Sequence, residues 1–398
     1  MKFGNYDHNR GDREDDMKPT KLFEPLVLRG LTLKNRIVIS PMCQHSAESN
    51  KPGAWHTVHL GAFSSGGAGL VLVESTAVTA SGRIGINDLG LWDDEQMKAF
   101  RPIIAFAHSQ GAAIGVQLSH AGRKAGSQPL WQGGRALTLA ELDATGQSWR
   151  RIGPSAISAG PGWSVPDEMM TPEIDEVIAA FVAAIRRADE AEFDVVELHF
   201  AHGYLVASFL SPVSNKRTDA YGGATENRMR LAVEVAKACR DVWPQRKPLF
   251  VRISAVDGAD GGWTLDESVI LARALRDVGV DVIDCSSGGL TEETRQANVP
   301  RGLGFQVPFA DRIRRDAGVM TQAVGVILDG RQAEAILAEG KADLVAIGRQ
   351  ALFDPFWALH AAQSLGVDPE FALWPKQYGC WLAKRAPMLA RLETDADH

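Results

Sequence analysis

Residues 195–204 have the sequence Val-Val-Glu-Leu-His-Phe-Ala-His-Gly-Tyr, an apolar run that ends in polar side chains. Its first residues are mostly β-forming and lack helical spacing, so they predict a buried strand that stops at His199. His202 and Tyr204 follow within a few residues. The fold prediction therefore starts from one strand whose end carries two imidazoles and a phenol.

Two imidazoles three residues apart are compatible with three kinds of site: a metal pair, a structural pair, or two donors to a substrate oxygen. A zinc site usually has a third ligand, often within a His-Glu-x-x-His helix, and neither is found here. Tyr204 favours the third interpretation. A phenol with its ordinary pKa of about 10 is protonated at neutral pH and can give a proton to a developing carbanion.

Short apolar runs alternate with helical segments on both sides of this strand. The predicted strands are 37–42, 69–74, 113–118, 195–199, 249–254, 280–285, 320–324 and 344–347. The predicted helices are 54–65, 94–110, 171–191, 226–242, 265–278, 307–316, 331–339 and 355–364, the third of them capped by Thr171 with Pro172 at its first position. This order is typical of an α/β protein with a (β/α)8 TIM barrel. A doubly wound open sheet is the alternative, but no Gly-x-Gly-x-x-Gly follows an early strand.

The remaining segments complete the predicted domain organisation. Residues 22–36 alternate around Arg29-Gly30 and predict an N-terminal β-hairpin that plugs one end of the core. Residues 120–170, after the third strand, predict a long Trp-bearing loop that either narrows the site entrance or is a solvent-exposed loop without a role. Residues 1–20 predict a flexible tail, 21–366 the barrel, and 367–398 a C-terminal extension at the active site or a subunit interface.

Composition limits the class of partner. A net charge of -7 over 398 residues argues against a nucleic-acid surface, and no apolar run reaches membrane-spanning length. The four cysteines are far apart in the sequence, so neither a zinc ribbon nor an iron–sulfur cluster is indicated. We expect a cytoplasmic protein with reduced thiols, packing roles for Cys239 and Cys285, and a small-molecule partner.

Polar residues gather at the predicted strand ends, where barrel enzymes have their active sites. The separated motifs are Ser-Pro-Met-Cys at 40–43, Gln-Leu-x-His-Ala-Gly-Arg at 117–123, His-x-x-His-Gly-Tyr at 199–204 and Ser-Pro-x-Ser-Asn-x-Arg-x-Asp-x-Tyr-Gly-Gly at 211–223. In these motifs the chain resembles, over about residues 21–366, the Old Yellow Enzyme family of FMN-dependent ene-reductases. The likeness is closest to its cysteine-bearing, thermophilic-like branch.

The resemblance implies FMN at the barrel mouth, with NADPH or NADH as reductant. The flavin contacts that it implies are Ser40, Pro41, Met42, Cys43, Ser75, Gln117 and Arg252, with phosphate contacts at Gly325, Gly348 and Arg349. A cation such as Arg252 would stabilise the reduced, anionic flavin. The phosphate site is also expected from the residues alone. The loops after strands seven and eight offer glycine N–H groups and an arginine, which suit a phosphate. The alternative is that Arg349 forms a surface ion pair. Cys43 could likewise be only a small buried hydrophobe.

The implied reaction has two half-reactions at one site. Hydride passes from the nicotinamide to the flavin and then to the β-carbon of an alkene conjugated to a carbonyl or nitro group. His199 and His202 would bind that group's oxygen, and Tyr204 would protonate the α-carbon. The nicotinamide would use the substrate pocket, which agrees with the missing dinucleotide fingerprint. We also expect a homo-oligomer.

The sequence departs from the branch pattern at two positions, and rival functions remain. His45 stands where a tyrosine is usual, so it is predicted as a substrate contact with a different pKa. Some members have an arginine near this end of the chain that enters the neighbouring subunit's site. Here Trp374, or Trp381, is predicted to line the substrate pocket instead. The rivals are an Old Yellow Enzyme-like demethylase, a flavin-binding module without turnover and a metal-dependent hydrolase. A dienoyl-CoA reductase is disfavoured because the chain lacks a cysteine cluster and an added nucleotide-binding domain.

Overall fold

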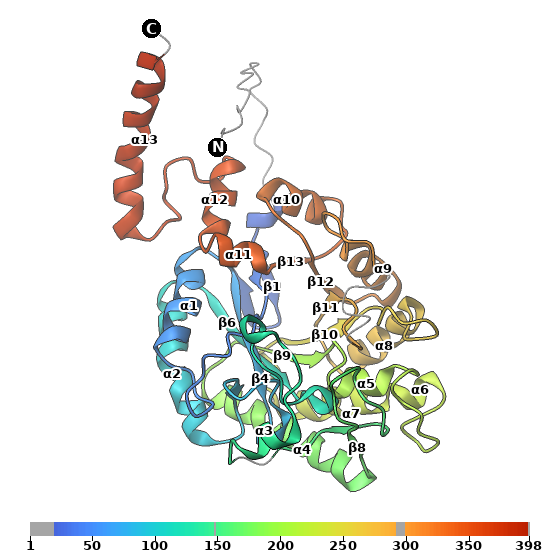
Figure 1. Cartoon of the computed structure of the whole chain (residues 1–398). Coiled ribbons are helices and arrows are strands. Elements are labelled where there is room, and N and C mark those ends of the chain that lie inside the picture. The colour runs from blue at the N-terminus through green and yellow to red at the C-terminus, as the bar shows by residue number, and fades with distance from the viewer. Residues whose placement is uncertain (1–19, 147–148, 292–298, 397–398) are drawn as a thin grey trace.

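A closed barrel of parallel strands forms the centre of the molecule (Figure 1). The structure is a computed structural model that describes residues 20–146, 149–291 and 299–396. Within them each barrel strand pairs with the next along the chain, and the last pairs with the first. The barrel strands are β3 (Ile37–Ile39), β4 (Leu70–Ala77), β6 (Ala113–Ser119), β9 (Val195–Phe200), β10 (Leu249–Ser254), β11 (Val282–Ser286), β12 (Met320–Val324) and β13 (Leu344–Ile347). The predicted (β/α)8 fold is confirmed.

Helices follow the barrel strands and surround them (Figure 1). The main helices are α1 (Ala54–Ser65), α2 (Asp94–Ser109), α4 (Thr171–Glu190), α7 (Arg230–Val242), α8 (Leu265–Asp277), α9 (Val307–Ala317), α10 (Gly330–Ala338) and α12 (Trp357–Ser364). Shorter elements are β1 (Leu26–Leu28), β2 (Leu31–Leu33), β5 (Leu89–Gly90), β7 (Ile152–Gly153), β8 (Asp167–Glu168), α3 (Leu139–Asp143), α5 (Leu205–Leu210), α6 (Thr225–Arg228) and α11 (Arg349–Phe353). The predicted N-terminal tail lies outside the described residues except for Thr20.

The predicted start of α4 is wrong by one residue. Met170 is the N-cap, so Thr171 is the first helical residue and Pro172 the second. The backbone N–H of Met170 donates to the carboxylate of Glu173 at 2.7 Å. The Glu173 carboxylate, in the first turn of the helix, thus accepts a hydrogen bond from the N-cap backbone. The N-terminus of α4 is therefore capped without a threonine hydroxyl.

Other element boundaries also differ from the prediction, and two of them have a clear physical reason. The predicted helix over residues 226–242 is two helices, α6 and α7, which meet at Met229. Arg228, at the end of α6, donates to the carbonyl of Leu210 and to Glu267, which fixes α6 against its neighbours. The first barrel strand ends at Ile39, because Pro41 has no N–H with which to continue the ladder.

The hairpin of β1 and β2 closes one end of the barrel, as predicted. Its apolar side chains pack with the inward-facing residues of the barrel strands. This cluster consists of Leu26, Leu28, Leu33, Val38, Leu70, Leu72, Val195, Phe250, Val282, Val324, Leu344 and Ala346. Because alternate residues of a strand face the same side, the next inward positions on β9 and β10 are Glu197 and Arg252. The barrel interior is therefore apolar at its hairpin end and polar toward its carboxyl-terminal end.

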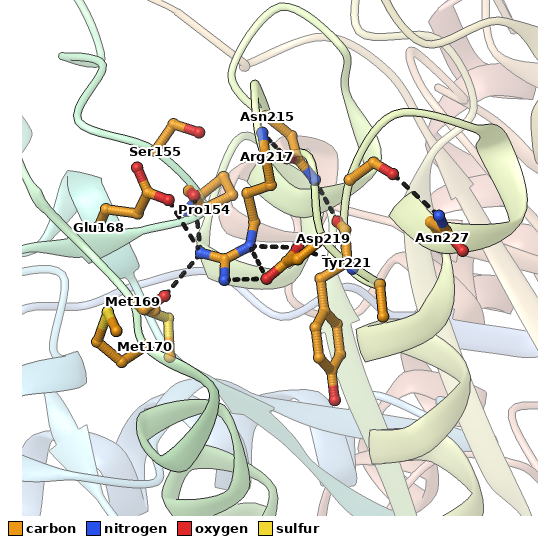
Figure 2. Close-up of polar contacts among 12 residues, drawn as sticks. Pro154, Ser155, Glu168, Met169, Met170, Asn215, Arg217, Asp219, Tyr221 and Asn227 are labelled. Atoms are coloured by element: carbon orange, nitrogen blue, oxygen red, sulfur yellow. Dashed lines mark hydrogen bonds and ion pairs between the residues drawn. The ribbon is translucent and has the colours of Figure 1, made fainter.

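The motif at residues 211–223 fastens the long loop after β6 to the barrel. Figure 2 shows the guanidinium of Arg217 between Asp219 and two backbone carbonyls of that loop. Its Nη1 donates to the carbonyl oxygens of Pro154 at 3.1 Å and Met169 at 2.6 Å. Asn215 also bonds within the motif, to the carbonyl oxygen of Tyr221 at 2.7 Å. This motif, which supported the family resemblance, has a structural role here.

Arg217→Met is expected to lower the free energy of unfolding by about 3 kcal/mol, because each buried carbonyl left without a donor costs about 1–3 kcal/mol. Urea unfolding followed by circular dichroism measures this change. Arg315→Met is the matched control, since the Arg315 side chain is 60% exposed in its pair with Asp311, and a loss below about 1 kcal/mol is expected. Equal losses in the two variants would contradict a clamping role for Arg217.

The C-terminal helix α13 (Lys376–Ala396) extends away from the barrel (Figure 1). Several of its large apolar side chains are exposed, among them Trp381, Met388 and Leu392. Among the described residues no helix is both long and apolar enough to cross a membrane. The division of the chain into a tail, a barrel and an extension stays a prediction.

Candidate functional site

A cavity of about 420 Å³ lies at the carboxyl-terminal ends of the barrel strands. Its volume falls within the range of small-molecule sites, about 300–1,000 Å³. The predicted residues that line it are Ser40, Pro41, Met42, Cys43, Ser75, Gln117, His199, His202, Tyr204, Arg252, Gly325, Gly348 and Arg349. The structure thus brings together every predicted site residue except His45 and Trp374.

A β-bulge in β4 lets Ser75 face this cavity. Val73 pairs with Val116 and Ser75 pairs with Gln117, so Glu74 is an extra residue between them. In a regular strand Glu74 would point inward and Ser75 outward. The Glu74 carboxylate instead accepts a hydrogen bond from the backbone N–H of Gln44, with 2.6 Å between N and Oε2.

The two imidazoles contact each other at the cavity wall. Nδ1 of His202 lies 3.3 Å from Nε2 of His199, and the ring of Tyr204 is centred 5.0 Å from that of His199. The backbone N–H of Ala201 donates to Nδ1 of His199 at 3.3 Å, which places the proton of a neutral His199 on Nε2. Nε2 of His202 lies 2.7 Å from Ser286 Oγ. A serine hydroxyl that donates to this nitrogen leaves the proton of a neutral His202 on Nδ1, beside the Nε2–H of His199.

The turn that carries His202 has backbone angles that most residues avoid. His202 and Gly203 have φ values of 59° and 71°, and a Cβ on Gly203 would lie 2.5 Å from the carbonyl oxygen of Gly289. The ammonium of Lys124 donates to that oxygen at 2.8 Å and to the carbonyl oxygen of His202 at 2.9 Å. Lys124 therefore holds this turn against the loop that follows β11.

Burial lowers the pKa of both His199 and His202 well below its usual value, and the positive charges of Arg252 and Lys124 lower it further. Both imidazoles are thus neutral at pH 7. Neutral imidazoles flanked by two cations can donate hydrogen bonds to an oxygen that carries negative charge.

The thiol of Cys43 lines the cavity without being a thiolate. Burial raises its pKa well above the usual value, and the charges of Asp88 and Glu74 raise it further. Cys239 and Cys285 are fully buried in the apolar core, as the sequence predicts.

Gly325, Gly348 and Arg349 lie where the cavity meets an adjoining groove of about 340 Å³. Gly325 has a φ of 116°, and a Cβ there would come within 2.9 Å of the Phe305 ring. Among the described residues Arg349 is exposed and makes no ion pair, so the surface-pair interpretation gains no support. Glycine backbone and a free guanidinium together suit an anionic group.

His45 is buried beside the site rather than in the wall of the cavity. Its Nδ1 lies 2.5 Å from Oδ1 of Asp88, and Trp131 from the long loop meets its ring edge-on. Burial alone would lower the pKa of His45, but the hydrogen bond and charge of Asp88, with the charge of Glu74, raise it above its usual value. His45 is thus bound to Asp88 outside the cavity lining, and its contact with substrate stays a prediction.

Trp374 packs away from the cavity, stacked on Phe356 with ring centroids 5.5 Å apart. The tryptophans of the long loop also lie outside the cavity wall. Trp149 packs under Arg83 and Trp163 under Arg151. Within the described chain the predicted narrowing of the entrance by these rings is not seen.

Sequence reasoning missed five polar residues of the cavity, Lys124, Ser286, Ser287, Arg301 and Gln306. Ser286 is the last residue of β11, so the strand-end rule that found His199 would also have found it. Lys124 directly follows the motif at residues 117–123, and its position next to that motif was the available signal.

His120, just beyond β6, makes the stability of the protein sensitive to acid. Burial lowers its pKa to about 4, so below about pH 6.5 the unfolded chain takes up a proton that the folded chain does not. The free energy of unfolding is expected to fall by about 2 kcal/mol between pH 7 and pH 5 from this residue alone, at about 1.4 kcal/mol per pH unit.

Urea unfolding at the two pH values measures this effect. His120→Asn keeps an acceptor for the backbone N–H of Gly122. This variant should lack the fall of about 2 kcal/mol in the free energy of unfolding that we assign to His120. A wild-type pH dependence in His120→Asn would contradict the prediction.

Comparison with known proteins adds independent information. Residues 21–367 match the model of the NADH:flavin oxidoreductase / NADH oxidase family. The chain is 45% identical over 350 residues to an NADPH dehydrogenase of Geobacillus sp. (strain WCH70). The aligned region covers 87% of this chain and 95% of that protein. It is also 44% identical over 362 residues to an NADPH dehydrogenase of Listeria innocua. That alignment covers 90% of this chain and 98% of the Listeria protein.

Solved structures agree with the observed architecture. Morphinone reductase in complex with tetrahydroNAD matches with a TM-score of 0.71 and 26% identity over 87% of this chain and 92% of that one. The Old Yellow Enzyme homologue from Zymomonas mobilis matches with a TM-score of 0.70 and 25% identity, over 85% and 90% of the two chains.

Proposed function

The chain belongs to the NADH:flavin oxidoreductase / NADH oxidase family and is an FMN-dependent NAD(P)H oxidoreductase of the Old Yellow Enzyme type, and from this we propose that it reduces alkenes activated by a carbonyl or nitro group. The proposal concerns the oxidising substrate and the residues that act on it. It also assigns the FMN site to the cavity at the barrel mouth.

The residues around this cavity fit FMN in size and chemistry. The buried hydroxyl of Ser40 has no hydrogen-bond partner among the described residues, so a polar group is available to a ligand. Gly325, Gly348 and Arg349 would hold the phosphate, and Ser75 and Gln117 would contact the isoalloxazine or ribityl chain. FMN bound there supplies the two-electron chemistry that links oxidation of NAD(P)H to reduction of the alkene.

The chain's own residues would orient and polarise the alkene. His199 and His202 would bind the carbonyl or nitro oxygen through N–H groups, and the resulting electron withdrawal makes the β-carbon electrophilic. Tyr204 would donate its phenolic proton to the α-carbon. Lys124 keeps the His202 turn in place, and Arg252 adds positive charge near the oxygen.

One observation carries this proposal: a neutral imidazole pair, flanked by two cations, lines the same cavity as a tyrosine. A metal site would need further ligands, and among the described residues no three His, Cys, Asp or Glu side chains come together for one. A flavin-binding module without turnover would not need this constellation. An Old Yellow Enzyme-like demethylase remains the second candidate, because it would use the same cavity.

Anaerobic reoxidation of the NADPH-reduced protein tests the proposal. Cyclohexenone should reoxidise the flavin with formation of cyclohexanone, and an N-methyl amine should not be demethylated by the oxidised protein. Titration with a phenol should produce a long-wavelength charge-transfer band, because the phenolate oxygen would bind the imidazole pair. Demethylation without alkene reduction would favour the second candidate.

We further propose a cytoplasmic homo-oligomer. The free thiols of the described cysteines support the cytoplasmic location. The exposed apolar side chains of α13 support the oligomer. In such an assembly residues 367–398, with Trp374 and Trp381, would lie at a subunit interface. Light scattering of the full chain and of a chain ending at residue 366 measures whether the extension contributes.

A further inference from the structure

Two carboxyl groups lie inside the barrel, directly beneath the cavity floor. Glu197 is two residues before His199 on β9, and Asp284 is two residues before Ser286 on β11, so both point into the barrel interior. Both residues are completely buried. Neither has a part in the proposed reaction, and the apolar cluster at the hairpin end of the barrel lies on their other side.

One cation faces these two acids. Arg252, on β10 between β9 and β11, pairs in register with Asp284, and its Nε lies 3.3 Å from Oδ2 of that residue. The other polar neighbours on the adjoining strands are neutral amides. Nε2 of Gln117 on β6 donates to Oε1 of Glu197 at 2.7 Å, and Gln322 on β12 pairs in register with Asp284.

The acid oxygens lack donors. Among the described residues no N–H or O–H group donates a well-directed hydrogen bond to either oxygen of Asp284 or to Oε2 of Glu197. Two fully buried carboxylates beside one guanidinium would leave one negative charge uncompensated, which is costly in a dry interior. A single proton on one acid removes that charge and supplies the missing donor to the other.

The protonation equilibria agree with this arrangement. Burial raises the pKa of Glu197 well above its usual value, and the charge of Asp284 raises it further. Burial also raises the pKa of Asp284, and the charge of Arg252 lowers the pKa of both acids. Because Arg252 Nε lies 3.3 Å from Oδ2 of Asp284, Asp284 is the anion and Glu197 is the acid that keeps its proton.

We propose that Glu197 and Asp284 share one proton, so that the pair carries a single negative charge that balances Arg252 beneath the flavin site. The pair then fixes how much positive charge the cavity presents to the reduced flavin. Glu197 and Asp284 are positioning residues that act through Arg252 and Gln117. The inference rests on the proposed FMN site, whereas the shared proton does not depend on which substrate is reduced.

Infrared difference spectroscopy of the holoenzyme in H₂O and D₂O tests the shared proton. With ¹³C-labelled glutamate, the wild-type protein should show a protonated-carboxyl C=O band that shifts with the label and disappears in Glu197→Gln. Glu74→Gln is the control, because Glu74 is another buried acid whose pKa burial raises, and it should leave the Glu197 band in place. The absence of any band that Glu197→Gln removes would overturn the proposal.

Spectroelectrochemical titration of the flavin tests the charge. Glutamine imitates a protonated glutamate, so Glu197→Gln should leave the midpoint potential nearly unchanged. The double variant Glu197→Gln/Asp284→Asn removes the anion, and the reduced flavin should be favoured at least tenfold, a rise of about 30 mV for a two-electron couple. A rise in Glu197→Gln followed by a similar further rise in the double variant would show two charges and refute the shared proton. An unchanged potential in the double variant would refute the link to the flavin, even if cyclohexenone were still reduced.

Discussion

Tyr204→Phe is expected to slow the reaction of the reduced enzyme with cyclohexenone by about 10²–10⁴-fold, the contribution of a positioned general acid. The substitution keeps the aromatic ring, whose centroid lies 5.0 Å from that of His199, and removes only the O–H group. The reduction of the enzyme by NADPH needs no proton from this phenol and should be unchanged. Stopped-flow measurement of the two half-reactions, each without oxygen, separates these effects.

The control for this prediction is Tyr378→Phe, on an exposed tyrosine of α13, which should affect neither half-reaction. Equal slowing of both half-reactions in Tyr204→Phe would mean that the hydroxyl maintains the cavity rather than supplying a proton. An unchanged oxidative half-reaction would require a different proton donor.

His199→Leu is expected to lower kcat/KM for the alkene by about 10²–10³-fold, the usual cost of removing one donor to a developing oxyanion. The same variant should bind a phenolate more weakly by a similar factor, because that ligand places its negative oxygen at the same N–H groups. The charge-transfer band gives the dissociation constant. His199→Gln keeps an N–H group and should recover part of both losses.

His360→Leu, on an exposed imidazole of α12, provides the matched control and should leave both values unchanged. If His199→Leu lost alkene turnover but bound the phenolate normally, the imidazole would not contact the substrate oxygen. Loss of bound FMN in this variant would instead indicate a role in holding the cofactor.

The barrel could be predicted from the sequence because its strands are covered on both sides. Strands such as 249–254 and 344–347 are short apolar runs between helical segments, and their observed bounds agree with the predicted ones. The strand-end rule and the quoted motifs then placed thirteen predicted residues around one cavity. Alternation along β4 would have pointed Ser75 outward, and only the family resemblance identified it.

The remaining features depend on contacts between distant segments. His45 was predicted to meet substrate, but Asp88, forty-three residues away, binds its imidazole. The shared environment of Glu197 and Asp284 depends on the register of β9, β10 and β11, which no local pattern reveals. Local sequence therefore predicted which residues lie at the barrel mouth better than it predicted what they bind there.

The bulge in β4 changes the phase of the alternation within a single strand. The extra residue, Glu74, leaves the inward row and anchors the backbone of Gln44 in the segment after β3. Neighbouring strands are thus not interchangeable modules in this barrel. Anyone who transplants residues 40–53 from a relative with an unbulged second strand should transplant β4 with them, or the new loop will lack its anchor.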